Sequence, residues 1–97
     1  MPDTRLTDAK AALDDERAFR ARSRGVRLFG LWAAAQRGLA EDAAAAYARD
    51  VVMADFEEAG DEDVIRKVAA DTAIDAARLR TELERCLAEA AHAVAEE

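Results

Sequence analysis

The sequence has few of the side chains on which enzyme chemistry depends. Its 97 residues include one cysteine, one histidine, one serine and no asparagine. Metal sites need several histidine or cysteine ligands, and nucleophilic catalysis needs a base beside the nucleophile. The single cysteine, Cys86, cannot form an internal disulfide, and its place on an apolar helical stripe predicts a small core residue. We therefore expect no catalytic residues, no metal site and no required cofactor, so the chain is not expected to be an enzyme.

Proline and glycine are also scarce, with one and four residues respectively, whereas 26 of the 97 residues are alanine. Alanine is the best helix former, and strand and turn signals are few. This composition predicts an all-α fold. The hydrophobic content of 52% leaves only 24 apolar residues larger than alanine, so the core should be thin.

The chain lacks a long apolar run and a basic excess. No stretch approaches the length that spans a bilayer, and the N-terminus carries acids, so we expect a cytoplasmic protein without direct membrane insertion. The formal net charge is −7. Residues 1–37 carry 8 basic and 5 acidic residues, whereas residues 38–97 carry 6 and 16. Such an acidic chain is not expected to bind nucleic acid.

Hydrophobic periodicity predicts four helices, at about residues 4–37, 40–59, 61–72 and 76 to the C-terminal end. Gly38 and Gly60 mark the ends of the first two, and Asp61 and Asp75 are expected to cap the last two. The expected inward positions recur at steps of three and four: Phe19, Val26, Phe29, Ala33; Tyr47, Val51, Val52, Phe56; Val64, Ile65, Val68; Leu79, Leu83, Cys86, Val94. Short connections favour an antiparallel four-helix bundle.

The first eighteen residues differ from the rest of the first predicted helix. After Met1, their only large apolar residues are Leu6 and Leu13, too few to dock this segment into a core. We therefore divide the chain into a mobile helical N-terminal arm, residues 1–18, and a bundle, residues 19–97.

The stretch "ADFEEAGDEDV", residues 54–64, packs six carboxylates around one glycine. A calcium-binding EF-hand loop counted from Asp55 would need an oxygen ligand at its fifth position and glutamate at its twelfth. Those positions hold Ala59 and Arg66. The stretch is therefore a joint between two helices or an acidic docking patch rather than a calcium site, and Asp61 is expected to cap the second helix.

A basic stripe, formed by Arg17, Arg20, Arg24 and Arg27, contrasts with the acidic background. Its steps of three and four place the four residues on one side of a helix. The stripe is either a solvated face or a site for an anion or an acidic partner, because guanidinium groups grip carboxylates and phosphates. Trp32 lies close to the same side, where it fills the core or stacks on an adenine.

Three segments carry a resemblance to a known family: "AKAALDDERAFRARSR" (9–24), "LFGLWAA" (28–34) and "YARDVVMADFEEAGDEDVIRKV" (47–68). In this order and spacing they resemble the zeta subunits, the ATPase inhibitor subunits, of α-proteobacterial F-type ATP synthases. The similarity runs from about residue 9 to the end.

The resemblance implies a four-helix bundle whose mobile N-terminal segment enters a catalytic interface of the ATPase head, made of α, β and γ subunits, and blocks ATP hydrolysis. The matching positions of that partner-binding segment are Ala9, Lys10, Ala12, Leu13, Asp14 and Glu16. The resemblance also implies a regulatory ADP or ATP site, which we place at Arg20, Arg24, Arg27 and Trp32. Such a protein would be cytoplasmic and peripheral to the inner membrane through the ATP synthase. The alternative hypothesis is a helical adaptor that bridges other subunits without inhibiting them.

Overall fold

The chain is almost entirely helical. The computed structural model describes residues 4–58 and 60–97, with side chains from Lys10 onwards. These residues form α1 (Thr4–Gln36), α2 (Glu41–Glu57), α3 (Glu62–Thr72) and α4 (Ala76–Ala95), and none of the described residues lies in a strand. The predicted all-α fold and the approximate bounds of its four helices are confirmed.

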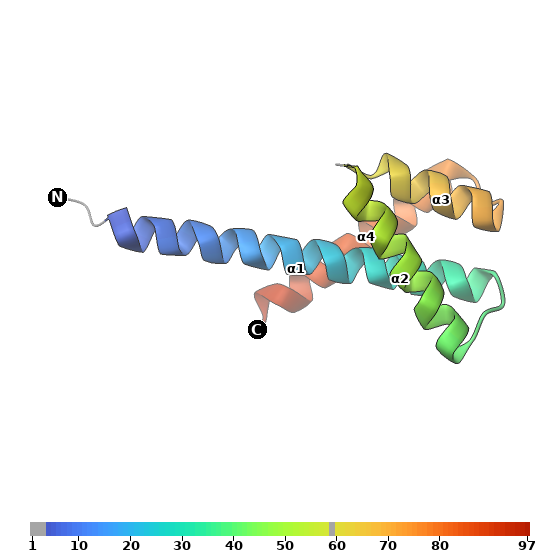
Figure 1. The fold of residues 1–97 in the computed structure, drawn as a ribbon, viewed down its shortest axis with the longest axis horizontal. Coiled ribbons are helices and arrows are strands. Elements are labelled where there is room, and N and C mark those ends of the chain that lie inside the picture. The colour runs from blue at the N-terminus through green and yellow to red at the C-terminus, as the bar shows by residue number, and fades with distance from the viewer. Residues whose placement is uncertain (1–3, 59) are drawn as a thin grey trace.

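Helix α1 is the longest of the four helices, and its C-terminal half contacts each of the others (Figure 1). α2 and α4 pack against it, and α3 contacts both of them, so the four helices close into a bundle. The N-terminal half of α1 extends beyond the bundle. The extents are therefore 57 × 25 × 20 Å, and the radius of gyration is 15.7 Å. A compact chain of this length would have a radius of gyration of about 12.5 Å.

The connections follow from local backbone chemistry. Gly38 ends α1 with a φ of 76°, and the N–H of Leu39 donates to the carbonyl of Ala34 over 3.0 Å, as in a Schellman motif. Gly60 has a φ of 95° in the joint between α2 and α3. Both glycines lie in the left-handed region, where a Cβ is strained. The end of α3 uses Ala73, at φ 60°, for the same purpose.

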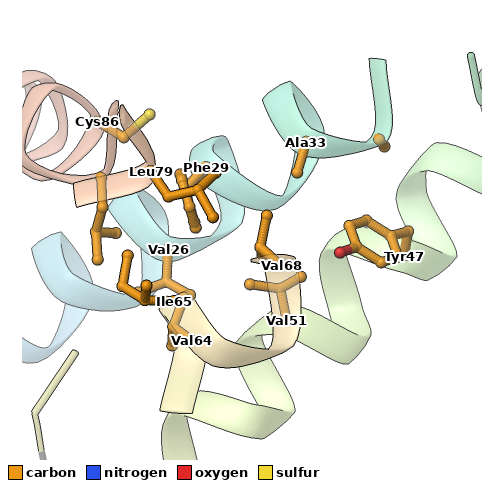
Figure 2. Close-up of a cluster of buried hydrophobic side chains, with 12 residues drawn as sticks. Val26, Phe29, Ala33, Tyr47, Val51, Val64, Ile65, Val68, Leu79 and Cys86 are labelled. Atoms are coloured by element: carbon orange, nitrogen blue, oxygen red, sulfur yellow. The ribbon is translucent and has the colours of Figure 1, made fainter. Parts of the chain in front are cut away.

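The core lies where the C-terminal half of α1 meets the other three helices (Figure 2). Its members have at most 6% of their surface exposed and include Val26, Phe29, Ala33, Tyr47, Val51, Val64, Ile65, Val68, Leu79, Leu83 and Cys86. All were predicted from the spacing of apolar residues. Burial also raises the pKa of the Cys86 thiol, which keeps it protonated and unreactive.

Two predicted core positions are wrong. Phe19 and Phe56 are 57% and 55% exposed, and their rings stack on each other with centroids 6.0 Å apart. Phe19 lies where α1 leaves the bundle, and Phe56 lies in the last turn of α2. The apolar stripe continues through both residues, but the packed helices do not cover it there.

Two glycines let the helices cross closely. A Cβ on Gly25 would lie 2.9 Å from the Cα of Leu87 in α4, and a Cβ on Gly30 would lie 2.8 Å from the Cα of Ala48 in α2. Real Cβ atoms do not approach backbone atoms so closely. The absence of a side chain at these positions therefore sets the separation of α1 from both of its main neighbours.

Candidate functional site

The predicted N-terminal arm is a continuation of α1 that stands clear of the bundle (Figure 1). Every side chain from Lys10 to Arg20 is exposed, and Leu13 has 43% of its surface accessible. Residues 1–3 and the side chain of Ala9 lie outside the described residues. The other predicted partner-binding residues, Lys10, Ala12, Leu13, Asp14 and Glu16, are all on this exposed segment.

The helical register divides these residues between two faces. Lys10, Leu13 and Asp14 follow steps of three and four and share one face. Ala9, Ala12 and Glu16 are positions of a second face. The arm therefore presents Leu13 flanked by two charged residues on one side, and two alanines with Glu16 on the other. A groove could enclose it on both sides, which is how amphipathic helices bind their partners.

The base of the arm, around Arg20 and Arg24, contacts Glu97, two residues after the end of α4. Its carboxylate lies 2.9 Å from Nη1 of Arg20 and 3.9 Å from Nη1 of Arg24. Two members of the predicted basic stripe therefore converge on one carboxylate. All three side chains are about half exposed, so this contact contributes little to stability.

On the opposite side, Arg22 holds the base of the arm to the acidic joint. Nη2 of Arg22 donates to Oδ1 of Asp55 over 2.6 Å, and Nη1 donates to Oδ1 of Asp61. The same guanidinium reaches the carbonyl of Gly60 over 3.3 Å. The hydrogen bond with Asp55 is the main cause that raises the pKa of Arg22. The acidic joint is therefore a receptor for an arginine from another helix.

Sequence reasoning missed Arg22, because it does not belong to the basic stripe. A signal was present: Arg22 lies three residues after Phe19 and four before Val26, on the face of α1 that turns toward α2 and α3. A charged residue on a face directed at other helices needs a partner. The excess of carboxylates in the joint supplies it.

The predicted capping roles of Asp61 and Asp75 need correction. Both residues occupy N-cap positions, but neither side chain makes a capping hydrogen bond. Asp61 instead pairs with Arg22, and its backbone is already helical, with φ −98° and ψ −14°. The first turn of α3 does contain Glu62 and Asp63, as predicted.

Other carboxylates of the joint are held by neighbouring bases. Glu62 lies 3.2 Å from Arg80 of α4, and Asp63 lies 3.1 Å from Arg66. A hydrogen bond with Asp63 raises the pKa of Glu58. Among the side chains that the structure describes, no cluster of three or more histidine, cysteine or acidic residues could hold a metal ion.

The four residues at which we placed a nucleotide site lie in two separate stretches of α1. Arg20 and Arg24 lie around Glu97, and Arg27 is exposed. Trp32, eight residues beyond Arg24, stacks on Phe29 with ring centroids 5.9 Å apart. The guanidinium of Arg78, in the first turn of α4, lies 5.8 Å from the Trp32 ring. Trp32 is half-buried, so it packs against the core and still presents part of its surface.

These features define an all-α protein that carries an exposed helix, anchored at its base by Arg22, beside a small helical core. The chain matches the family described as ATPase inhibitor subunit zeta over residues 4–93, and it belongs to that family. The resemblance drawn from the sequence is therefore confirmed.

A solved structure supports the same fold. It is described as "Solution NMR structure of the protein", is 44% identical in sequence and superposes with a TM-score of 0.73. The match covers 80% of this chain and 94% of the other. No curated protein matches the chain.

Proposed function

We propose that this chain is a regulatory subunit that binds the catalytic head of an F-type ATP synthase and inhibits ATP hydrolysis through its N-terminal arm. Membership of the ATPase inhibitor family supports the inhibitory role. The observation that carries the mechanism is the exposure of every side chain from Lys10 to Arg20 on a helix that leaves the bundle.

In this mechanism the arm acts as a wedge. Residues 4–18 have only Leu6 and Leu13 as large apolar side chains, too few to hold the segment against the bundle. In this mechanism they are therefore mobile before they bind, and they become ordered in the cleft between catalytic subunits. Leu13 supplies the apolar contact, and Lys10, Asp14 and Glu16 supply polar contacts. The small side chain of Ala12 allows close approach on the other face. Inhibition then needs no chemistry from this chain and no cofactor.

The proposed partner is the head formed by α, β and γ subunits. The protein would then lie at the cytoplasmic side of the inner membrane, held there by the ATP synthase. No helix in the described part of the chain has the length and apolar character to cross a bilayer.

The test is steady-state ATP hydrolysis by the purified catalytic head with three proteins: the wild type, a variant lacking residues 1–18, and Leu13→Ser. We expect the wild type to inhibit, the truncated variant not to inhibit, and Leu13→Ser to inhibit more weakly. Ala35→Ser, also exposed but near the other end of α1, is the matched control and should inhibit like the wild type. Circular dichroism checks that each variant is helical.

Inhibition by the truncated variant equal to that of the wild type would show that the bundle is the effector and that the arm mechanism is wrong. If the wild type binds the head without changing its rate, the adaptor hypothesis replaces the inhibitor hypothesis.

We also propose ADP or ATP as a regulatory ligand at Arg20, Arg24, Arg27 and Trp32. The convergence of Arg20 and Arg24 on one carboxylate supports an anion site, because guanidinium groups bind carboxylate and phosphate in the same way. Titration with ADP should shift the amide resonances of these residues and the indole resonance of Trp32. Shifts confined to α2 and α3 would reject the placement, and the absence of any shift would reject the ligand.

A further inference from the structure

An exposed apolar patch lies at the base of the arm. Phe19 of α1 stacks on Phe56 of α2, and Met53 lies one helical turn before Phe56 on the same side of α2. We call these three residues the apolar patch. Their exposed fractions are 57%, 58% and 55% for Phe19, Met53 and Phe56. Of the large apolar side chains that the structure describes as exposed, only Leu13 lies outside this patch.

The patch is not needed to hold α1 against α2. The hydrogen bonds between Arg22 and Asp55 already join the two helices at this level, and Asp55 directly precedes Phe56. Met53 takes no part in the ring stack and is more than half exposed. Contiguous exposed apolar side chains with a polar rim are typical of interaction sites.

The rim of the patch is acidic. Asp15 and Glu16 lie one turn before Phe19, and Glu57 and Glu58 directly follow Phe56; all four are exposed. Of the nearby bases, Arg22 binds two carboxylates and Arg20 pairs with Glu97. Arg66 and Lys67, which line a hollow with Met53, pair with Asp63 and Asp71. Arg17 and Arg49 are exposed, but the four exposed carboxylates outnumber them, so the patch has an acidic excess. The complementary surface is therefore a basic segment with an apolar side chain at its centre. Arginine suits this site doubly, because its guanidinium pairs with carboxylates and stacks on phenyl rings.

The position of the patch identifies which partner it meets. Leu13 and Phe19 belong to one continuous helix and are six residues apart, which corresponds to about 9 Å along the axis. A protein that encloses residues 10–18 therefore also lies close to Phe19. The partner of the arm and the partner of the patch are therefore the same molecule.

We propose that the apolar patch is a second docking site for the ATPase head. It receives a basic segment with an apolar side chain, at the mouth of the cleft that holds the arm. The identity of the partner rests on the function proposed above. The arm then supplies inhibition, and the patch sets how long the subunit stays bound.

The experiment measures association and dissociation rates of the full chain on the immobilised catalytic head. Phe19→Ser/Phe56→Ser should raise the dissociation rate at least about tenfold, because buried aromatic residues dominate interface energetics. Glu57→Lys/Glu58→Lys should lower the association rate severalfold and flatten its dependence on salt. The matched control, Glu84→Lys/Glu89→Lys, makes the same change in charge on the exposed side of α4 and should leave both rates unchanged.

Wild-type rates for both patch variants would overturn the inference. Weaker inhibition by Leu13→Ser in that case would leave the arm mechanism standing. A wild-type protein that does not bind the head would overturn the proposed function and the inference together. Thermal melting accompanies each variant, and if the double phenylalanine variant is unfolded, Met53→Ser and the lysine variant decide, because their positions are exposed.

Discussion

The guanidinium of Arg22 and the carboxylate of Asp55 form a two-point contact between α1 and α2. Nη2 lies 2.6 Å from Oδ1, and Nε lies 3.3 Å from Oδ2. The two residues are 33 positions apart in the chain, and only 11% of the Asp55 side chain is exposed. This contact fixes α1 to the acidic joint at the point where the arm begins.

Arg22→Gln should therefore lower the free energy of unfolding by about 1–2 kcal/mol, since hydrogen bonds to charged, partly buried groups are worth more than surface pairs. Arg24→Gln is the control, because Arg24 is 53% exposed and its nearest carboxylate oxygen is 3.9 Å away. Its cost should stay below about 0.5 kcal/mol. Chemical denaturation measures both, and equal costs would contradict the proposed importance of the Arg22 contact.

The close crossing at Gly30 predicts that Gly30→Ala is destabilising. Alanine has a helix propensity about 1 kcal/mol better than glycine, but the new methyl group would lie 2.8 Å from the Cα of Ala48. Overpacking against backbone costs about 1–3 kcal/mol, so the net change should be a loss. Thermal melting tests this, and a raised melting temperature would show that α2 can move away from α1.

Leu83→Ala and Phe56→Ala should differ strongly. Leu83 is 1% exposed, and its truncation should cost about 2–5 kcal/mol. Phe56 is 55% exposed, so its truncation should cost less than about 1.5 kcal/mol, most of it from the lost ring stack. Denaturation of the two variants side by side provides the measurement, and similar costs would place Phe56 in the core.

Tyr47→Phe should make stability less dependent on pH under acidic conditions. The Tyr47 hydroxyl donates to Oδ2 of Asp71 over 2.9 Å, and Lys67 lies 3.1 Å from the same oxygen. Desolvation acts to raise the pKa of Asp71, but the hydrogen bonds from Tyr47 and Lys67 outweigh it and lower the pKa below 3.8. Because the folded-state pKa is depressed, this stabilisation is present above the unfolded-state pKa of about 4 and is lost as the pH falls through the folded-state value.

The difference in unfolding free energy between wild type and Tyr47→Phe should thus be about 1 kcal/mol at pH 6–7 and should shrink below pH 4. Urea titrations at several pH values provide the measurement. A difference that stays constant down to pH 3 would mean that the hydroxyl does not stabilise the charged carboxylate.

Limited trypsin digestion should distinguish the arm from its anchored base. Lys10 and Arg17 are exposed on the part of α1 that precedes the Arg22 contact, so cleavage after them should come first. Arg22 is held by Asp55 and Asp61, so cleavage after it should be slow. Mass spectrometry of early fragments provides the readout, and equally rapid cleavage at Arg17 and Arg22 would show that the anchor does not hold in solution.

The sequence by itself determined the helices, most of the core and the family. Two local properties indicate the helices and their buried faces, whatever the neighbouring helices are: the alanine content and the spacing of apolar residues. The spacing follows steps of three and four from Val26 to Phe29 and Ala33, and from Leu79 to Leu83 and Cys86. Gly38 and Gly60 likewise mark chain reversals, because a positive φ is a local requirement. The motifs at residues 9–24, 28–34 and 47–68 were enough to indicate the zeta subunit family.

Only the tertiary structure decided where the packed helices stop and which charges meet. Phe19 and Phe56 lie on correctly predicted apolar stripes, yet more than half of each side chain is exposed. Where the buried part of a stripe ends depends on how far α2 and α3 extend beside α1. Asp61 occupies a capping position, but the proximity of Arg22, 39 residues away, gives its carboxylate a different partner. Sequence periodicity gives the direction of a side chain around its own helix; the partner it meets depends on the relative placement of helices, which is set by close crossings such as those at Gly25 and Gly30.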